Sequence, residues 1–247
     1  MSEKSFIFGI HAVETLLEKQ PKRIIRLAVL HDRHDKKIQF IAELAKVNKI
    51  KVEHCSRQEL DRLTQNENHQ GVIAFCQKPK NYAEHDLDAI LENTTKKPFL
   101  LILDGIQDPH NLGACLRSAD AAGVDAVIAP KDKSVGLTPA VSKVASGAAE
   151  TVPFIQVTNL ARTLRDLKER GIWVFGAAGE AEKSIFEADL DVPLALVLGA
   201  EGSGLRRLTR EHCDVLLNIP MHGTVSSLNV SVAAGIFLFE AVRQRSS

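Results

Sequence analysis

The sequence contains few cysteines, no long apolar run and no dinucleotide-binding fingerprint. The four cysteines are Cys55, Cys76, Cys115 and Cys213. They form no CxxC pair and have no histidine cluster at metal-ligand spacing, which excludes a disulfide scaffold and a zinc ribbon. The longest apolar stretches, such as residues 99–103, are as short as a strand, and no basic segment leads into an apolar one at the start of the chain. We therefore expect a soluble, cytoplasmic protein with no membrane span, signal peptide or metal site.

The sequence also has no net charge, with 31 Lys and Arg against 31 Asp and Glu. The charges are unevenly spread, because residues 1–80 hold 15 basic and 10 acidic residues, whereas residues 81–247 hold 16 and 21. A basic first third indicates a module that faces a polyanion. An ordinary solvated surface explains so small an excess about equally well.

The hydrophobic periodicity divides the chain into two α/β parts. A length of 247 residues is enough for one large domain or two small ones. Residues 1–77 predict a small alternating module, and residues 78–97, rich in Lys, Pro, Asn, Glu, Asp and His, predict a linker. Within the module we expect helices over 9–19, around 38–45 and from the capping box of Ser56 and Glu59 to Leu63, with strands over 24–30, 50–55 and 71–76.

Residues 98–247 predict a second domain with a mostly parallel sheet. Its expected strands are 99–103, 126–129, 152–157, 172–176, 194–199 and 215–219. These runs are apolar without alternation, which is typical of strands covered on both faces. A final helix from about Leu228 to Arg243 is expected to bury Val232, Ala233, Ile236, Phe237 and Phe239.

Polar residues and glycines follow three of these strands, at the sheet edge where open α/β sheets bind ligands. The first segment, residues 104–118 (DGIQDPHNLGACLRS), predicts a helix that begins at Pro109 with Asp108 or Asn111 as its cap. Capping does not explain Arg117 on that helix. A cation whose side chain extends to solvent is the simpler interpretation of Arg117 taken alone.

The other two segments lie later in the chain. Residues 196–205 (LVLGAEGSGL) place Glu201 among glycines whose spacing is the reverse of GxGxxG, so a dinucleotide fingerprint is excluded and a plain turn is the simpler interpretation. Residues 219–233 (IPMHGTVSSLNVSVA) form a loop in which Ser226 or Ser227 is expected to cap the final helix. Asn229 and Ser231 are poor helix formers within that helix's first turns.

Together the three segments resemble the three motifs of the SpoU or TrmH-type ribose 2′-O-methyltransferases of the SPOUT class. The similarity extends to FGIHAV (residues 8–13) and HQGVIA (residues 69–74). It implies an α/β fold in which a C-terminal parallel-sheet domain with a trefoil knot follows a small ribosomal-protein-like RNA-binding domain. It also implies S-adenosylmethionine as cofactor, and a homodimer whose active sites draw on both subunits. The implied substrate is a guanosine of 23S ribosomal RNA, in the P loop of the peptidyl-transferase centre.

The resemblance also assigns site residues by motif position. The implied catalytic residues are Arg117, Asn111, Glu201, Ser227 and Asn229. The implied cofactor contacts are Gly199, Ile219, Leu228, Met221, Ala178 and Gly179. A guanidinium does not deprotonate in proteins, so we expect Arg117 to bind the target phosphate and stabilise the developing alkoxide rather than act as a base.

Three other functions remain open. The chain could methylate transfer RNA or another site in ribosomal RNA. It could be a catalytically silent RNA-binding factor in ribosome assembly, or a nucleotide-dependent metabolic enzyme with a conventional doubly wound sheet. The complete set of polar motif residues argues against the silent factor, and the missing GxGxxG and Walker patterns argue against the metabolic enzyme.

Overall fold

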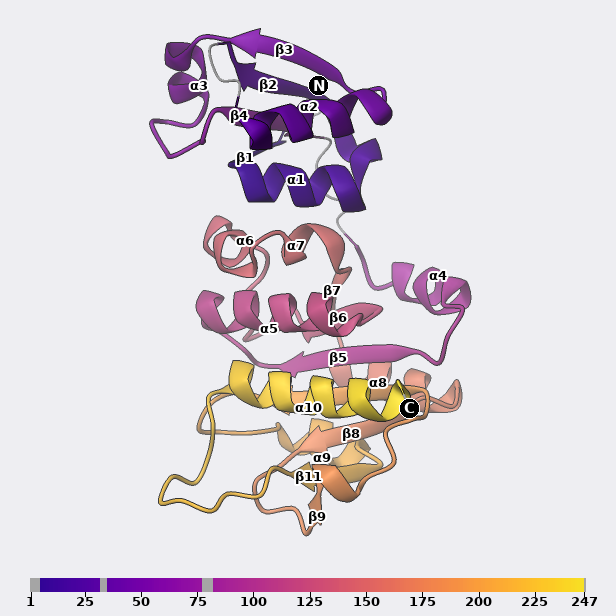
Figure 1. Cartoon of the computed structure of the whole chain (residues 1–247). Coiled ribbons are helices and arrows are strands. Elements are labelled where there is room, and N and C mark those ends of the chain that lie inside the picture. Colours follow the sequence, from indigo (N-terminus) through magenta and orange to yellow (C-terminus); the bar gives the residue numbers. More distant parts are fainter. Residues whose placement is uncertain (1–4, 32–34, 77–81, 247) are drawn as a thin grey trace. The chain divides into compact units, whose positions relative to one another are not determined.

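A computed structural model describes residues 5–31, 35–76 and 82–246 (Figure 1). The chain separates into two compact units, residues 1–80 and 81–247. In the described part of the chain, no helix is long and apolar enough to cross a membrane.

The first unit is a four-stranded sheet with helices on both faces. Its elements are β1 (Ser5–Phe8), α1 (Ile10–Lys19), η1 (Pro21–Arg23), β2 (Ile24–Leu30), α2 (Lys36–Val47), β3 (Lys51–Cys55), α3 (Arg57–Leu63) and β4 (Val72–Cys76). The strand order is β1-β4-β2-β3, with β2 and β3 parallel and the other pairs antiparallel. Helices α1 and α2 pack on one face, and α3 packs through Leu60 on the other.

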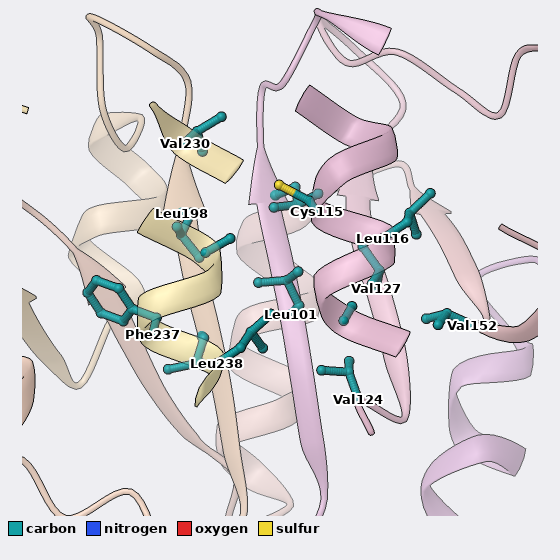
Figure 2. Close-up of a cluster of buried hydrophobic side chains, with 14 of the residues drawn as sticks. Leu101, Cys115, Leu116, Val124, Val127, Val152, Leu198, Val230, Phe237 and Leu238 are labelled. Atoms are coloured by element: carbon teal, nitrogen blue, oxygen red, sulfur yellow. The ribbon is translucent and has the colours of Figure 1, made fainter. Parts of the chain in front are cut away.

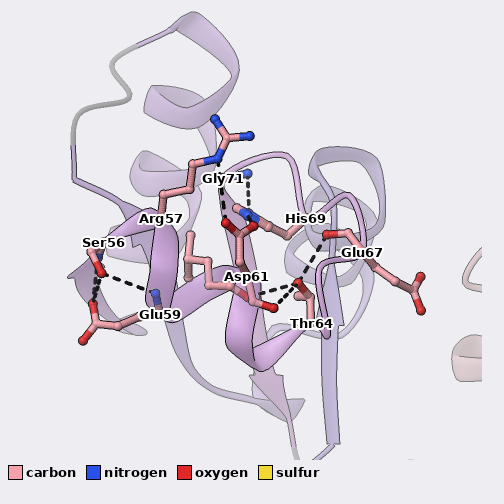
Figure 3. Close-up of polar contacts among 9 residues, drawn as sticks. Ser56, Arg57, Glu59, Asp61, Thr64, Glu67, His69 and Gly71 are labelled. Atoms are coloured by element: carbon pink, nitrogen blue, oxygen red, sulfur yellow. Dashed lines mark hydrogen bonds and ion pairs between the residues drawn. The ribbon is translucent and has the colours of Figure 1, made fainter.

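Local signals account for most of this unit. The expected capping box begins α3, because Ser56 Oγ accepts from Glu59 N and the Glu59 carboxylate accepts from Ser56 N. His69, in the HQGVIA segment, is buried and structural: its Nδ1 accepts from Gly71 N, and its Nε2 lies 2.9 Å from Asp61 Oδ1 (Figure 3). Strand β1 is not among the expected elements, because its four residues are held by antiparallel pairing with β4, whose partners lie 65 to 71 positions later in the chain.

The second unit contains a seven-stranded parallel sheet, ordered β7-β6-β5-β10-β8-β11-β9. Its first elements are α4 (Asp86–Asn93), β5 (Phe99–Asp104), α5 (Pro109–Ala122), β6 (Ala126–Pro130), α6 (Pro139–Ala145), α7 (Ala148–Thr151), β7 (Phe154–Val157) and α8 (Leu160–Glu169). They are followed by β8 (Trp173–Ala177), β9 (Lys183–Ser184), η2 (Ile185–Glu187), β10 (Leu194–Gly199), α9 (Arg207–His212), β11 (Val215–Asn218) and α10 (Val230–Arg245).

Two apolar clusters lie on opposite faces of this sheet. Helices α5 and α10 cover one face, where Cys115 and Leu116 of α5 and Phe237 and Leu238 of α10 pack on strand residues such as Leu101 (Figure 2). Helices α4 and α8 cover the other face. Coverage of both faces explains why β5 and β6 are buried throughout, as the unbroken apolar runs predicted.

Two expectations need correction. The segment expected as a linker, residues 78–97, contains α4, whose Leu87 is buried on the sheet with Ile90 and Leu91 against the same cluster. Helix α10 begins at Val230 and is capped by Asn229, not by Ser226 or Ser227, because Asn229 Oδ1 accepts from Ser231 N.

The burial expected for the final helix is also partly wrong. Phe237 is buried, and Ala233 and Ile236 are partly buried. Val232 and Phe239 are half exposed, at 51% and 50%. Apolar residues occur on every side of α10, so periodicity alone does not show which side meets the sheet.

Candidate active site

The three motif segments meet at the carboxyl edge of the parallel sheet. Strands β5 and β10 are neighbours, and their last residues, Asp104 and Gly199, are register partners. Helix α5 begins just beyond β5, with Pro109 at its first position and Asp108 Oδ1 accepting from His110 N, as predicted. Helix α10 lies beside α5, so the first turns of the two helices face the loop that follows β10.

Glu201, at the tip of that loop, joins the two helices. Its Oε1 accepts a hydrogen bond from Asn111 Nδ2 at 3.2 Å and another from Asn229 Nδ2. Asn229 Nδ2 also donates to Asn111 Oδ1 at 3.0 Å, and Val230 N lies 3.4 Å from Glu201 Oε1. Three of the five expected catalytic residues therefore form one hydrogen-bonded cluster, although 118 positions separate the first from the last.

The loop folds back tightly on the strand before it. A Cβ at Gly199 would lie 2.1 Å from the carbonyl carbon and oxygen of Gly204 and 2.4 Å from Leu205 N. Glycine is thus required at position 199 by the chain's own backbone.

An ion pair between a buried carboxylate and a partly exposed guanidinium closes the same loop. Asp104 is fully buried and accepts from Arg206 N at 3.0 Å, and its carboxylate pairs with the Arg206 guanidinium at 2.5 Å. Sequence reasoning did not single out either residue. The available signal was a carboxylate that ends a fully apolar strand, because a buried charge requires a partner.

A cavity of about 630 Å³ opens between the loops that follow β8, β10 and β11. It is lined by all six residues expected to contact the cofactor, Ala178, Gly179, Gly199, Ile219, Met221 and Leu228, and by Glu201, Ser227 and Asn229. Leu198, Leu217 and Phe237 add apolar wall. This combination of size, apolar wall and few polar groups is typical of a small-molecule site.

A second cavity, of about 440 Å³, adjoins the first. It is lined by Asn111, Asp104, Gln107, Lys133 and Arg206 among others, and it shares Ala200, Glu201, Gly204 and Val230 with the first cavity. Glu201 therefore lies in the wall common to both cavities, with Asn229 lining the first cavity and Asn111 the second.

Arg117 does not join this cluster within one chain. It is exposed on α5, six residues beyond Asn111, and it lines neither cavity. Ser227 lines the first cavity but makes no side-chain hydrogen bond to the cluster. Among the residues that the structure describes, no group of three or more His, Cys, Asp or Glu could hold a metal ion.

Comparison with known proteins places these features in one family. The SpoU rRNA Methylase family matches residues 98–239, and the domain described as "RNA 2'-O ribose methyltransferase substrate binding" matches residues 6–82. The 23S rRNA (guanosine-2'-O-)-methyltransferase RlmB of Shewanella oneidensis is 59% identical over 247 residues and 100% of both chains. The enzyme of the same name from Haemophilus influenzae is also 59% identical, over 99% of both chains.

Solved structures agree with this assignment. The SpoU methyltransferase AviRb from Streptomyces viridochromogenes, in complex with the cofactor AdoMet, has a TM-score of 0.75 at 26% identity, over 99% of this chain and 91% of that one. The A. aeolicus TrmH/SpoU tRNA modifying enzyme has a TM-score of 0.57 at 31% identity, over 66% of this chain and 84% of the other. The resemblance found in the three motifs is confirmed, and the chain belongs to the SpoU rRNA methylase family.

Proposed function

We propose that this protein transfers a methyl group from S-adenosylmethionine to the ribose 2′-hydroxyl of a guanosine in 23S ribosomal RNA, in the P loop, in the cytoplasm. The observation that carries the proposal is the Glu201 cluster, whose central carboxylate lines both of two adjoining cavities, in a chain 59% identical along its whole length to enzymes named for this reaction. Two adjoining cavities are what a transfer between a small cofactor and a nucleoside requires.

The residues of the first cavity fit the cofactor. Leu198, Leu217 and Phe237 offer an apolar wall to an adenine ring, and the backbone at residues 177–179 and 217–219 lies open to polar contacts. Glu201 places a carboxylate on the wall, which favours a positively charged ligand. When bound, S-adenosylmethionine would supply a sulfonium methyl group for in-line attack by the 2′-oxygen, so that an O–C bond forms, the S–C bond breaks and S-adenosylhomocysteine leaves.

The chain's part in the reaction is alignment and charge stabilisation. Asn111 and Asn229 hold the Glu201 carboxylate in one orientation, so the wall between the cavities is fixed before ligands bind. We assign Arg117 to the target phosphate, where its planar guanidinium holds the phosphate and stabilises negative charge on the 2′-oxygen. The hydroxyl proton then leaves to the phosphate or to water.

We propose that the Arg117 of each active site comes from a second copy of the chain. The outward side of α10 exposes Val232 and Phe239, with Ile236 between them, and Arg117 is exposed on the neighbouring helix α5. Such an apolar stripe on an outer helix fits a self-complementary contact. We propose a homodimer through this surface, with Arg117 of the partner subunit completing each site.

We further propose that the first unit selects RNA and that the second carries the chemistry. The three motifs all lie in the second unit, and the first holds the basic excess. A chain that starts at Asn81 keeps α4, and it should bind S-adenosylmethionine but lose most activity on ribosomal RNA. Undiminished methylation by this shortened chain would place RNA recognition in the second unit.

Two measurements test the function. Isothermal titration should show binding of S-adenosylmethionine and S-adenosylhomocysteine and no binding of NAD. Mass spectrometry of 23S ribosomal RNA from cells that lack the protein should show one guanosine without its 2′-O-methyl group, restored by the purified enzyme. An unmodified nucleotide in transfer RNA instead would support the alternative substrate, the class on which the A. aeolicus tRNA modifying enzyme acts.

A further inference from the structure

In the described residues of the first unit, part of one face of the sheet is covered by no helix. Helix α3 covers this face through Leu60, which packs in one cluster with Ala28, Ile73 and the buried Phe75. The next cross-strand row lies on the same face: Phe6 is the register partner of Phe75, Phe75 of Arg26, and Arg26 of Lys51. We call these four residues the Phe6 row. Phe6 has 40% of its surface exposed, although a large apolar ring is normally buried.

The Phe6 row combines aromatic rings with oriented cations. The rings of Phe6 and Phe75 have centroids 6.5 Å apart, and Arg26 Cζ lies 3.6 Å from the centre of the Phe75 ring. Glu53 pairs with Arg26 at 2.5 Å and with Lys51 at 2.9 Å. The hydrogen bond from Lys51 makes the largest contribution to lowering the pKa of the Glu53 carboxyl, and the charge of Arg26 lowers it further. Glu53 therefore stays ionised and holds the Arg26 guanidinium over the Phe75 ring.

We propose that the Phe6 row is a stacking surface for unpaired bases of the RNA substrate, an inference that rests on the proposed function. An unpaired base stacks on an exposed phenyl ring or on a guanidinium plane, whatever its identity. Arg26 is already supported on one side by Phe75, so little conformational freedom is lost when a base covers its other side. Lys51 is largely exposed beside it and can contact the neighbouring phosphate.

Charge and family both favour RNA over a protein partner. Residues 1–80 carry five more basic than acidic side chains, and residues 6–82 match a domain described as substrate binding. Paired bases present only their edges, so the surface fits single-stranded loops and not duplex. The surface does not read sequence, because every base has a face to stack; it holds the RNA while the second unit acts on the ribose.

The chain offers a matched pair of variants. Phe6→Leu removes the aromatic face and keeps an apolar side chain against Phe75. Phe40→Leu makes the same change at a phenylalanine that is 43% exposed on α2, which packs on the opposite face of the sheet. With a 23S ribosomal RNA fragment that contains an unpaired loop, Phe6→Leu should raise the Kd by about tenfold, and Phe40→Leu should leave it within about twofold. Equal affinities for the two variants would overturn the proposal.

A fluorescent reporter tests the surface directly. The sequence has one tryptophan, Trp173, so Phe6→Trp combined with Trp173→Phe gives a full-length protein with a single reporter on the Phe6 row. Its emission should be that of a solvated indole, and a single-stranded RNA oligonucleotide should quench it saturably. Emission from a buried indole before RNA is added would show that protein covers the row. That result, or an emission that saturating RNA leaves unchanged, would refute the inference.

A charge-conserving variant separates stacking from electrostatics. Arg26→Lys keeps the positive charge but loses the guanidinium plane, so it should weaken RNA binding without changing the salt dependence. Binding of S-adenosylmethionine serves as the independent readout, since the Phe6 row lies in the other unit. If the wild type neither binds this cofactor nor methylates RNA, the proposed function fails. If it does both, and the variants keep the wild-type KM for RNA, only the present inference fails.

Discussion

Asn229 uses the two ends of its side-chain amide for two different tasks. Its Oδ1 caps α10 by accepting from Ser231 N at 2.9 Å and Ser231 Oγ at 2.6 Å. Its Nδ2 donates to Glu201 and to Asn111. The residue that starts the helix therefore also fixes the carboxylate at the site.

Substitutions of Asn229 can separate the capping of α10 from the positioning of Glu201. Asn229→Asp keeps an oxygen for the cap but places a second carboxylate oxygen against Glu201 and Asn111 Oδ1, so stability should hold while methyl transfer falls by about 100-fold or more. Asn229→Ala should lose both, with about 1 kcal/mol of the free energy of unfolding. Urea unfolding and a methyl-transfer assay on each variant measure the two effects. Wild-type turnover in Asn229→Asp would show that the cluster is structural only.

Gly199 is predicted to tolerate no side chain. Gly199→Ala forces the backbone at Gly204 and Leu205 to move, which displaces the Glu201 loop and should weaken S-adenosylmethionine binding by about tenfold or more. Gly223→Ala is the control, because it lies in the third motif loop with no atom within 4 Å of the added Cβ and no strained φ. Calorimetric titration of both variants decides the point, and equal affinities would contradict it.

The pair of Asp104 and Arg206 is expected to stabilise the loop rather than react. Arg206→Ala leaves a buried carboxylate without its cation, which should cost about 2 to 3 kcal/mol in the free energy of unfolding. Adding Asp104→Asn to that variant removes the stranded charge and should recover part of the loss. Trp173 fluorescence in urea reports on the second unit, since it is the only tryptophan. Additive losses in the double variant would mean that the two side chains do not interact.

The placement of Arg117 leads to a complementation test. If each site takes Arg117 from one subunit and Asn229 from the other, Arg117→Ala and Asn229→Asp are each inactive, but a mixed dimer has one intact site. Random exchange should restore about a quarter of wild-type activity. The two inactive variants are mixed, incubated to exchange subunits and assayed. No recovery, with exchange shown by mass spectrometry, would place Arg117 and Asn229 in the same subunit's site.

The elements of the second unit were largely predictable, because strands covered on both faces leave unbroken apolar runs such as residues 99–103. The loops that carry Asn111, Glu201 and Asn229 were predictable as well, since each follows such a strand or begins a helix. Their hydrogen bonds were not predictable, because the partners lie 28 to 118 positions apart and meet only when β5 and β10 become neighbours. The family resemblance assigned these three residues to one site but did not indicate their hydrogen bonds.

Three other features could not be predicted from local sequence patterns. The exposed side of α10 cannot be told from its buried side, because Val232 and Phe239 are as apolar as Phe237. The pairing of Asp104 with Arg206 joins positions 102 residues apart. The trefoil knot is a property of how the whole chain is threaded, so no local pattern encodes it, and it stays a prediction.

Cys115 should make the stability of the second unit depend on pH above 9. It is fully buried on α5 against the sheet, and burial raises the pKa of its thiol to about 12 from an ordinary 9. Between these values the folded chain keeps the proton and the unfolded chain releases it, so the thiol's contribution is fully present below pH 9 and falls as the pH rises toward 12. The loss from pH 8 to pH 10 should be about 1 kcal/mol.

The measurement compares how much the free energy of unfolding changes with pH in the wild type and in a Cys115 variant. Urea unfolding followed by Trp173 fluorescence at pH 8 and pH 10 gives the change for the wild type, which also contains contributions from other thiols such as Cys213, whose pKa burial raises to about 12. Cys115→Ala removes one thiol and leaves those contributions in place. Its stability is lower at both pH values because α5 loses packing, but it should change less between them. An identical change in the two proteins would mean that the Cys115 thiol ionises as readily in the folded state as in the unfolded chain, which its burial beneath α5 makes unfavourable.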